Sequence, residues 1–390
     1  MPAASHRIST ITGTGDDGWS IMYRARDLKA AGIAVADLTV GEHDVRTDPA
    51  ILAEMNRSAR AGHTGYASVP GIAALRDAVA ARIAARTGVP TTRANIVITP
   101  GAQSALFAAH HATCNAGDRA LMIDPYYATY PGTIRAVGAV PVAVPARPED
   151  EFQPDIAALD RAAAGATSLL INTPNNPTGA VYCDQSLRDI ARVAQAHDLW
   201  VISDEVYDTQ VWDGAHQSIR ALPDMAARTL VAGSLSKSHA MTGSRLGWIC
   251  GPEAMIAHLI NLATHTTYGV PGYIQDAGLF ALNMGDAAEA AIAAPFRRRR
   301  DIVLDMLAGQ NLVRAIPPQG AMYAMLDIRA TGLSGDAFAG ALLDSERIAV
   351  MPGESFGQAA AGHLRVALTL PDDQFTPAFA RLLDFAARQV

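Results

Sequence analysis

The sequence predicts an α/β protein that is built on a mostly parallel sheet with helices on both faces. Short apolar runs alternate with helical segments along the middle of the chain, which is the pattern of buried parallel strands. Of the 390 residues, 49% are hydrophobic and 18% are charged, so the chain can bury a large core. Its length favours two domains.

The first part of the chain is predicted to form an arm, a helix and a short strand. Apolar residues recur loosely at helical spacing over residues 19–33, and a short strand is expected at 35–40. The turn-prone residues 41–44 follow. Further on, Tyr66 lies in a glycine-containing loop, where a tyrosine serves either as a site residue or as a surface anchor.

Six apolar runs mark the expected strands of the sheet. They are residues 96–99, 120–123, 140–144, 168–171, 199–203 and 229–232. Helical segments separate most of them. In a sheet of this kind, ligands bind beyond the carboxyl ends of the strands. The polar residues that follow each run are therefore candidate site residues.

Three stretches directly after these runs carry such polar residues. Residues 100–103 form a tight turn ahead of a helix, and backbone N–H groups at such a turn favour an anion. In residues 172–179, two prolines and a glycine fix the backbone, so the amide of Asn176 is presented rigidly. Asp204 follows the next run. Taken alone, Asn176 could simply close an Asx turn, and Asp204 could cap a helix.

Lys237 is an exception in a chain that uses arginine almost everywhere. Lys29 and Lys237 are the two lysines among 31 basic residues, and the other 29 are arginines. A lysine amine can lose its proton in a desolvated site and attack a carbonyl carbon, which arginine cannot do. Lys237 follows the last apolar run and lies among small hydroxyl residues. We therefore interpret it as a reactive lysine and not as a chance surface residue.

Composition argues against several classes of function. The formal net charge of −7 gives no basic field for nucleic acid, and the basic run 297–300 is interpreted as a solvated helix with some ion pairs. Three widely spaced cysteines argue against a disulfide framework and for a reducing compartment. No apolar run is long enough to span a bilayer, and no histidine has other ligands at metal spacing. We expect a cytoplasmic protein with no metal, nucleic-acid or membrane partner.

Seven motifs occur in an order that resembles one enzyme family. They are Tyr66 with Gly71, Gly101-Ala102-Gln103, Asp124-Pro125-Tyr126-Tyr127, Asn175-Asn176-Pro177-Thr178-Gly179, Asp204 to Tyr207, Ser234 to Arg245, and Gly362-His363-Leu364-Arg365. In combination they resemble the class I aminotransferases, which are pyridoxal 5′-phosphate enzymes of fold type I. Stretches such as 19–25 and 198–207 further resemble the arginine:pyruvate aminotransferase subgroup.

The resemblance implies a fold and a division into domains. Fold type I has a large domain with a mostly parallel seven-stranded sheet between helices, and a smaller α+β domain. For this chain it implies an N-terminal arm with part of the small domain at 1–44, a large cofactor-binding domain at 45–285 and a small C-terminal domain at 286–390.

The same resemblance implies the residues that hold the cofactor. Lys237 would bind it covalently and later move a proton, Asp204 would pair with its ring nitrogen, and Tyr207 would hydrogen-bond its ring oxygen together with Asn176. Tyr127 would stack on the ring, with Tyr126 as the alternative. The phosphate would be held by the remaining residues, Gly101, Ala102, Gln103, Ser234, Ser236 and Arg245.

The substrate and a partner subunit are implied in the same way. Arg365 would clamp the α-carboxylate of the substrate, close to Asn176 and the backbone of Gly41. Without the resemblance, Arg365 could be a strand-end arginine in a surface ion pair. Tyr66 would reach the phosphate in the neighbouring subunit, so a homodimer with shared sites is expected.

Three functions stay open from the sequence. The first is transfer of the amino group from an L-amino acid to a 2-oxo acid, and the second is a lyase or synthase reaction on the same scaffold. The third, a binding module without catalysis, is disfavoured because the reactive lysine is present. For the donor, the acidic residues Asp16, Asp17, Glu42 and Asp44 favour a cation such as arginine, with pyruvate as acceptor, whereas Ile11, Trp19 and Tyr23 favour neutral or aromatic donors.

Overall fold

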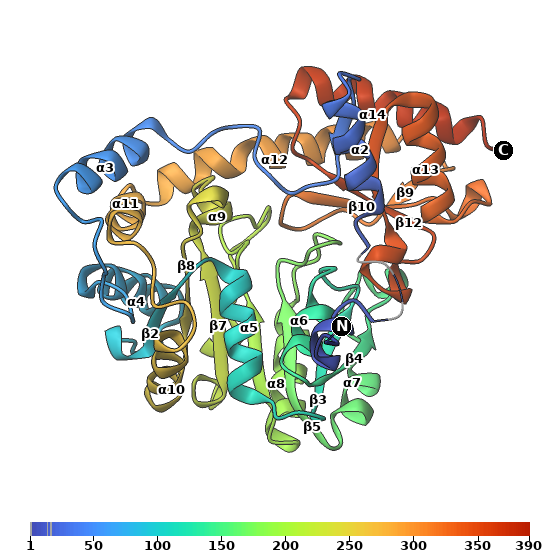
Figure 1. The fold of residues 1–390 in the computed structure, drawn as a ribbon. Coiled ribbons are helices and arrows are strands. Elements are labelled where there is room, and N and C mark those ends of the chain that lie inside the picture. The colour runs from blue at the N-terminus through green and yellow to red at the C-terminus, as the bar shows by residue number, and fades with distance from the viewer. Residues whose placement is uncertain (1, 14, 16–17) are drawn as a thin grey trace.

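Two sheets organise the molecule (Figure 1). The computed structural model describes residues 2–13, 15 and 18–390. The large sheet has seven strands: β2 (Ile96–Thr99), β3 (Arg119–Asp124), β4 (Val140–Pro145), β5 (Ala166–Asn172), β6 (Trp200–Asp204), β7 (Thr229–Ser234) and β8 (Gly247–Cys250). The small sheet has five: β1 (Ala36–Leu38), β9 (Arg314–Ala315), β10 (Tyr323–Asp327), β11 (Ile348–Pro352) and β12 (His363–Ala367).

The large sheet confirms the predicted α/β architecture. Its strand order is β2-β8-β7-β6-β5-β3-β4, and the pairs from β7 to β4 are all parallel. Strand β8 is antiparallel to both of its neighbours and was not among the predicted strands. Register places Asn172 of β5 beside Asp204 of β6, so the polar residues that end these strands meet at one edge.

Helices cover both faces of the large sheet. Side chains alternate across a strand, so Leu169 and Ile171 of β5 belong to the apolar cluster of α7 and α8, whereas Leu170 belongs to that of α5. The helices are α1 (His6–Ser9), α2 (Ser20–Ala30), α3 (Pro49–Arg60), α4 (Ala73–Thr87), α5 (Ala102–Thr113), α6 (Tyr130–Ala136), α7 (Ile156–Ala163), α8 (Asp184–Ala196), α9 (Leu235–Ser238), α10 (Glu253–Thr264), α11 (Gly272–Asn283), α12 (Asp286–Leu307), α13 (Gly335–Glu346) and α14 (Asp372–Ala387).

The small sheet is assembled from the two ends of the chain. Strand β1 pairs in parallel with β11, while β10, β11 and β12 are connected by antiparallel pairs. The long helix α12 runs from the large sheet towards the small sheet (Figure 1). The boundaries at 44/45 and 285/286 stay a prediction.

One expectation about α12 was wrong. The basic run 297–300 is not solvated throughout, because Arg299 is only 2% exposed. Its guanidinium pairs with Asp44 at 2.6 Å and with Asp372 at 2.7 Å. Consecutive helical residues point in different directions, so one of four arginines faced the core. This pairing also removes Asp44 from the carboxylates that could meet a substrate.

The described residues contain neither a membrane-spanning helix nor a cluster of metal-binding side chains. No helix among residues 2–13, 15 and 18–390 is long and apolar enough to cross a membrane. In the same residues, no group of three or more His, Cys, Asp or Glu side chains is arranged to hold a metal ion.

Candidate active site

A cavity of about 430 Å³ opens at the carboxyl ends of β5, β6 and β7. It brings together twelve of the predicted site residues, namely Gly41, Ala102, Gln103, Tyr127, Asn176, Asp204, Tyr207, Ser234, Ser236, Lys237, Arg245 and Arg365. Two predicted residues do not line it. Gly101 lies next to Arg245, which lines the cavity. Tyr66 is 92% exposed, and its ring packs against the ring of Tyr268.

Lys237 reaches the cavity from the short helix α9. Ser234 caps this helix by accepting a hydrogen bond from the N–H of Ser236 at 3.3 Å, which fixes the turn that follows β7. The Lys237 Nζ donates to the carbonyl oxygen of Gly41. Burial lowers the pKa of the Lys237 amine to about 8, because the charged form loses hydration. A substantial fraction of this amine is therefore neutral and nucleophilic slightly above neutral pH.

Asp204 ends β6 with its carboxylate at the floor of the cavity. The hydroxyl of Tyr130 donates to it at 2.7 Å, and the N–H of Val206 donates at 3.3 Å. Burial raises the pKa of Asp204 to about 6, and the bond from Tyr130 acts in the opposite direction. The carboxylate is consequently ionised at neutral pH and can pair with a protonated ring nitrogen.

Arg365 is a buried cation without an acidic partner among the described residues. Its guanidinium donates to Asn176 Oδ1 at 2.8 Å and to the carbonyl oxygen of Thr39. The rings of Tyr323 and Phe356 lie 4.5 and 4.4 Å from its central carbon. Its Nε has no hydrogen-bond partner within residues 2–13, 15 and 18–390. A buried charge in this state is stabilised by an anion, and a planar carboxylate suits its fork.

The start of α5 forms a cradle at the other end of the cavity. Gly101 has φ +80°, and a Cβ on it would lie 2.4 Å from Arg245 Nη2, so glycine is required there. The first N–H groups of α5 have no intrahelical partner, and Ser234 and Ser236 line the same wall. Backbone N–H groups, hydroxyls and one arginine are the donors that a phosphate needs, so the residues present fit the phosphate of pyridoxal phosphate.

The aromatic residues of the site answer one open question and add contacts that the sequence did not reveal. Tyr127 lines the cavity, whereas Tyr126 lines a separate, larger one. The hydroxyls of Tyr207 and Tyr323 lie 3.0 Å apart. Tyr323 comes from the small sheet, and no motif marked it. Tyr130 is the first residue of α6, three residues after Tyr127, and no motif marked it either.

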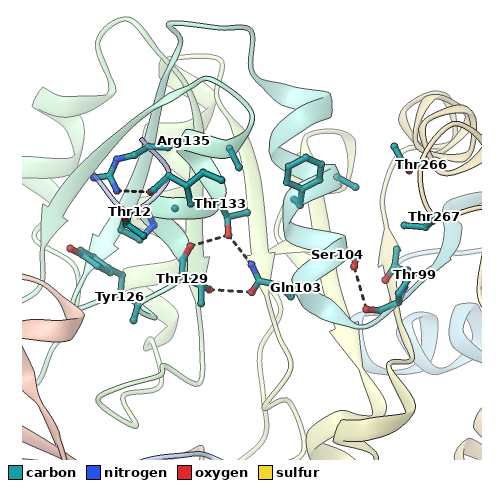
Figure 2. A pocket seen from close by; sticks show the side chains of 18 of the residues that line it. Thr12, Thr99, Gln103, Ser104, Tyr126, Thr129, Thr133, Arg135, Thr266 and Thr267 are labelled. Carbon is teal, nitrogen blue, oxygen red and sulfur yellow. Dashed lines mark hydrogen bonds between the residues drawn. The ribbon is translucent and has the colours of Figure 1, made fainter. Parts of the chain in front are cut away.

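The larger cavity encloses about 970 Å³ beside α5, α6 and α10. Figure 2 shows Gln103, which lies between Thr129 and Thr133 and hydrogen-bonds both. Neither a lysine nor a histidine lines this cavity. The chemistry therefore belongs to the smaller cavity, while Gln103 and Trp19 line both.

Comparisons with known proteins agree with this arrangement. The family model "Aminotransferase class I and II" matches residues 33–382. The arginine–pyruvate transaminase of Pseudomonas aeruginosa is 42% identical over 380 residues, which cover 97% of this chain and 96% of that protein. The aspartate/prephenate aminotransferase of Thermus thermophilus is 34% identical, covering 93% and 95%. The structure of Thermus thermophilus aspartate aminotransferase with maleate superposes with a TM-score of 0.92 at 31% identity and full coverage of both chains.

The fold and the site thus define a fold type I enzyme of amino-acid chemistry. The chain belongs to the class I and II aminotransferases. It is a transaminase whose cofactor is pyridoxal 5′-phosphate and whose substrates are amino acids and 2-oxo acids.

Proposed function

We propose that the cavity around Lys237 transfers the amino group of an L-amino acid to a 2-oxo acid in two half-reactions. The proposal is carried by the convergence of a lysine, a buried carboxylate and a buried arginine, which has no acidic partner in the described part of the chain, on one cavity of about 430 Å³. Pyridoxal phosphate supplies an aldehyde that binds amines covalently and a ring that accepts electrons. Every other part of the catalysis is assigned to residues of the chain.

Lys237 and Asp204 have complementary roles in this proposal. The Nζ of Lys237 would hold the cofactor covalently and would act as the base that takes the proton from the substrate α-carbon. Its lowered pKa supports the role of base. The ionised carboxylate of Asp204 would pair with the ring nitrogen and keep it protonated. The hydroxyl of Tyr207 and the amide of Asn176 bind the ring oxygen.

The substrate end is assigned to Arg365. Its guanidinium, held in place by Asn176, binds the α-carboxylate of the donor and of the acceptor. The backbone of Gly41 lies next to that group. The cradle of Gly101, Ala102, Gln103, Ser234, Ser236 and Arg245 binds the phosphate.

The assignment of Lys237 has a direct test. The purified holoenzyme should be yellow, and borohydride reduction followed by peptide mapping should place the cofactor on Lys237. In Lys237→Ala the visible absorbance should change and turnover should fall by several orders of magnitude. Addition of an amino acid alone should yield pyridoxamine phosphate. A label on Lys29 would contradict the assignment.

We infer that the working enzyme is a homodimer and acts in the cytoplasm. Tyr66 is 92% exposed and Tyr268, against which it packs at 5.1 Å, is 52% exposed, which is unusual for two neighbouring large aromatic rings. A second copy would cover them and bring Tyr66 to the phosphate of its own site. Cys114, Cys183 and Cys250 are all unpaired, which supports a reducing compartment.

For the donor we propose a cationic amino acid such as arginine, with pyruvate as acceptor. Of the four acidic candidates, Glu42 lines the cavity, Asp44 is engaged by Arg299, and Asp16 and Asp17 lie outside the described residues. The name of the Pseudomonas aeruginosa relative points to the same pair of substrates. Because Glu42 is exposed, its pairing would contribute less than about 1 kcal/mol unless the substrate desolvates it.

The donor is tested by kcat/KM for L-arginine, L-alanine, L-aspartate and L-phenylalanine with pyruvate or 2-oxoglutarate. Arginine with pyruvate should give the highest value, and Glu42→Gln should lower it for arginine while leaving alanine unchanged. Trp19 lines the cavity and favours an aromatic donor. If Trp19 determines the specificity, phenylalanine should have the highest kcat/KM. A dicarboxylic donor that is about a hundredfold better would reject the cationic proposal.

A further inference from the structure

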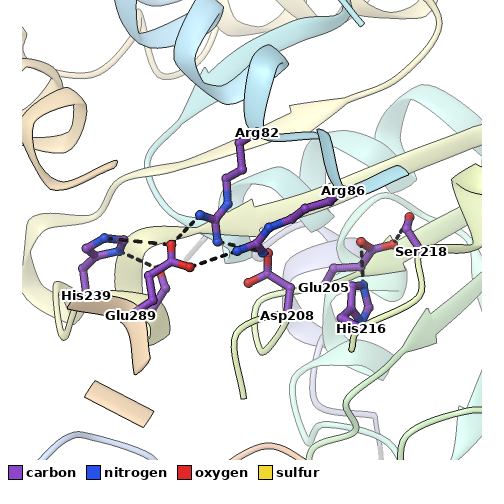
Figure 3. A network of polar contacts seen from close by, with 9 residues as sticks. Arg82, Arg86, Glu205, Asp208, His216, Ser218, His239 and Glu289 are labelled. Carbon is purple, nitrogen blue, oxygen red and sulfur yellow. Dashed lines mark hydrogen bonds and ion pairs between the residues drawn. The ribbon is translucent and has the colours of Figure 1, made fainter. Parts of the chain in front are cut away.

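A partly buried cluster of charges lies beside the active site and takes no part in the proposed chemistry. It consists of Arg82 and Arg86 on α4, Asp208 after β6, and Glu289 near the start of α12, and we call it the charged cluster (Figure 3). The two arginines are four residues apart and therefore share one helix face. Three chain segments that are distant in sequence meet in it.

Each arginine of the charged cluster contacts both carboxylates. Arg82 binds Glu289 through Nη1 and approaches Asp208 at 3.3 Å through Nη2. Arg86 binds Asp208 through Nη1 and Glu289 at 2.9 Å through Nη2. The result is a closed ring with two positive and two negative charges. In the side chain, Glu289 is 6%, Arg82 14% and Asp208 18% exposed, whereas Arg86 is 33% exposed, so the loss of a partner leaves the charge of Glu289 or Arg82 with little compensation from solvent.

The cluster is joined directly to the segment that carries Tyr207. Asp208 is the next residue in the chain, and the hydroxyl of Tyr207 projects into the active-site cavity, 3.0 Å from that of Tyr323. The backbone around Asp208 cannot shift without moving Tyr207. The ion pairs of Asp208 therefore fix the position of this hydroxyl relative to α4.

The cluster also adjoins the segment that carries Lys237. His239 is 2% exposed, and its Nε2 lies 4.0 Å from Glu289 Oε1 (Figure 3). Its Nδ1 lies 2.8 Å from the hydroxyl of Ser238. Helix α9, which bears Lys237, packs on α12 in this region. Glu289 thus lies next to His239, two residues after Lys237. Arg82 and Arg86 contact Asp208, the residue that follows Tyr207.

We propose that the charged cluster is a positioning element for catalysis, which sets the Tyr207 hydroxyl and the Lys237 amine at a fixed separation. This inference rests on the roles proposed above for those two residues. A displacement of about 1 Å in a catalytic group can reduce a rate by up to about a hundredfold, so a rigid charged support has a clear use. The cluster residues touch neither substrate nor cofactor and act through Tyr207 and Lys237.

The test uses the holoenzyme and measures the pH at which the visible absorbance of bound pyridoxal phosphate is half changed. Glu289→Gln keeps the shape and removes one charge. Arg86→Gln combined with Asp208→Asn removes one charge of each sign and is the variant that keeps the balance. Asp77→Asn is the matched control, because it breaks the exposed Arg93–Asp77 pair on the same helix α4.

We expect the midpoint to move by at least about half a pH unit in both cluster variants, in the same direction as in Tyr207→Phe. The kcat should fall by about tenfold, with the KM of the donor within about twofold. In a Tyr207→Phe background, the Arg86→Gln/Asp208→Asn variant should add no further shift, because Asp208 acts through that hydroxyl, whereas Glu289→Gln should keep only the part of its shift that acts through Lys237. Asp77→Asn should match the parent enzyme.

Other outcomes distinguish a failure of the role proposed for Tyr207 from a failure of the role proposed for the charged cluster. A Tyr207→Phe variant with an unmoved midpoint would contradict the role of Tyr207 and, with it, the route by which the cluster acts. If Tyr207→Phe shifts the midpoint but the cluster variants lower only the melting temperature, the cluster stabilises the fold without positioning the catalytic groups, and the inference fails. A full shift of the Arg86→Gln/Asp208→Asn variant that persists in the Tyr207→Phe background would mean that Asp208 does not act through Tyr207, which also rejects the inference.

Discussion

At the scale of single residues, the site is made of ordinary groups whose burial changes their proton affinity. Lys237 has a pKa of about 8 and Asp204 of about 6, and in both cases burial is the largest cause. The two shifts have opposite directions because burial disfavours whichever form carries the charge. Near neutral pH the carboxylate is ionised and the amine is partly neutral, which is the combination that the proposed chemistry needs.

Removal of the Tyr130 hydroxyl should shift the acidic limb of the pH profile. The hydrogen bond from Tyr130 to Asp204 stabilises the ionised carboxylate, so its loss in Tyr130→Phe raises the pKa of Asp204 further. We expect the acidic limb of kcat/KM to move up by about one pH unit, since a hydrogen bond to a charged group contributes about 1.5 to 3 kcal/mol. Rates measured from pH 5 to 9 check this.

Tyr182→Phe is the control for that experiment. Tyr182 is also a buried tyrosine, at 3% exposure, but it belongs to the apolar cluster of α8 and does not line the cavity. Its pH profile should coincide with that of the parent enzyme. An acidic limb that stays in place in Tyr130→Phe would show that Tyr130 does not support the ionised state of Asp204.

At the scale of elements, the helix α5 has the proposed phosphate-binding residues at its N-terminus and a buried histidine near its C-terminus. Its N-terminus depends on the left-handed conformation of Gly101 and on the close approach of Arg245. Eight residues further on, His110 is fully buried, and neither of its ring nitrogens has a hydrogen-bond partner among the described residues. One helix thus offers a test of binding and a test of stability.

Gly101→Ala should weaken the binding of pyridoxal phosphate. Alanine in a left-handed conformation costs roughly 1 to 2 kcal/mol, and its Cβ would also displace the Arg245 guanidinium. We expect the Kd of the cofactor to increase by about tenfold or more, as measured by titration of the cofactor-free protein. Gly117→Ala is the matched control, with φ +89° and open space around the added Cβ. Equal affinity in the two variants would contradict the cradle.

His110 should make the protein less stable in acid. Burial lowers the pKa of His110 to about 4, whereas the unfolded chain takes up the proton near pH 6.5. Between these values the unfolded state binds more protons than the folded state. The free energy of unfolding therefore decreases as the pH is lowered, by up to about 3 kcal/mol from this group. Urea unfolding at pH 7 and pH 5 should show a smaller loss for His110→Leu than for the parent.

At pH 7, His110→Leu should also be at least as stable as the parent. The substitution removes two unsatisfied polar atoms from an apolar site, which is neutral or favourable. An identical pH dependence in the parent and the variant would show that His110 acquires a proton or a partner in the folded state.

At the scale of the whole molecule, the active site is an interface between two sheets and, as proposed, between two chains. Arg365 and Tyr323 come from the small sheet, and Asn176, Asp204 and Lys237 follow strands of the large one. Strand β1 lies in the small sheet and leads into Gly41, whose carbonyl oxygen accepts a hydrogen bond from Lys237. Neither sheet alone forms the site.

Hybrid dimers test the contribution of a second chain. Tyr66→Phe should weaken the phosphate contact in the neighbouring site, and Lys237→Ala should inactivate its own site. Mixing the two variants after mild dissociation should restore activity towards one native site in each hybrid dimer, because one site then has both residues intact. Sedimentation that shows a fully active monomer would overturn the shared site.

The sequence determined the α/β fold, the polar edge of the sheet and most of the residues that line the smaller cavity. Alternating apolar runs identify buried strands, and the side chains that follow them have to meet at one edge. Lys237 was recognisable because arginine cannot replace a reactive amine. Asp204 and Asn176 follow consecutive strands of that sheet, which is why local sequence sufficed for them.

Only the tertiary structure decided which residues meet from distant segments. Tyr323, Tyr130 and the charged cluster had no local signature, because a contact between separate elements depends on their packing and leaves no periodic pattern. Arg299 was expected in solvent but is buried against Asp44, since helix position and not charge decides which side of α12 faces the core. Proton affinities follow the same rule: the type of residue sets the ordinary pKa, and burial, which the fold creates, moves it.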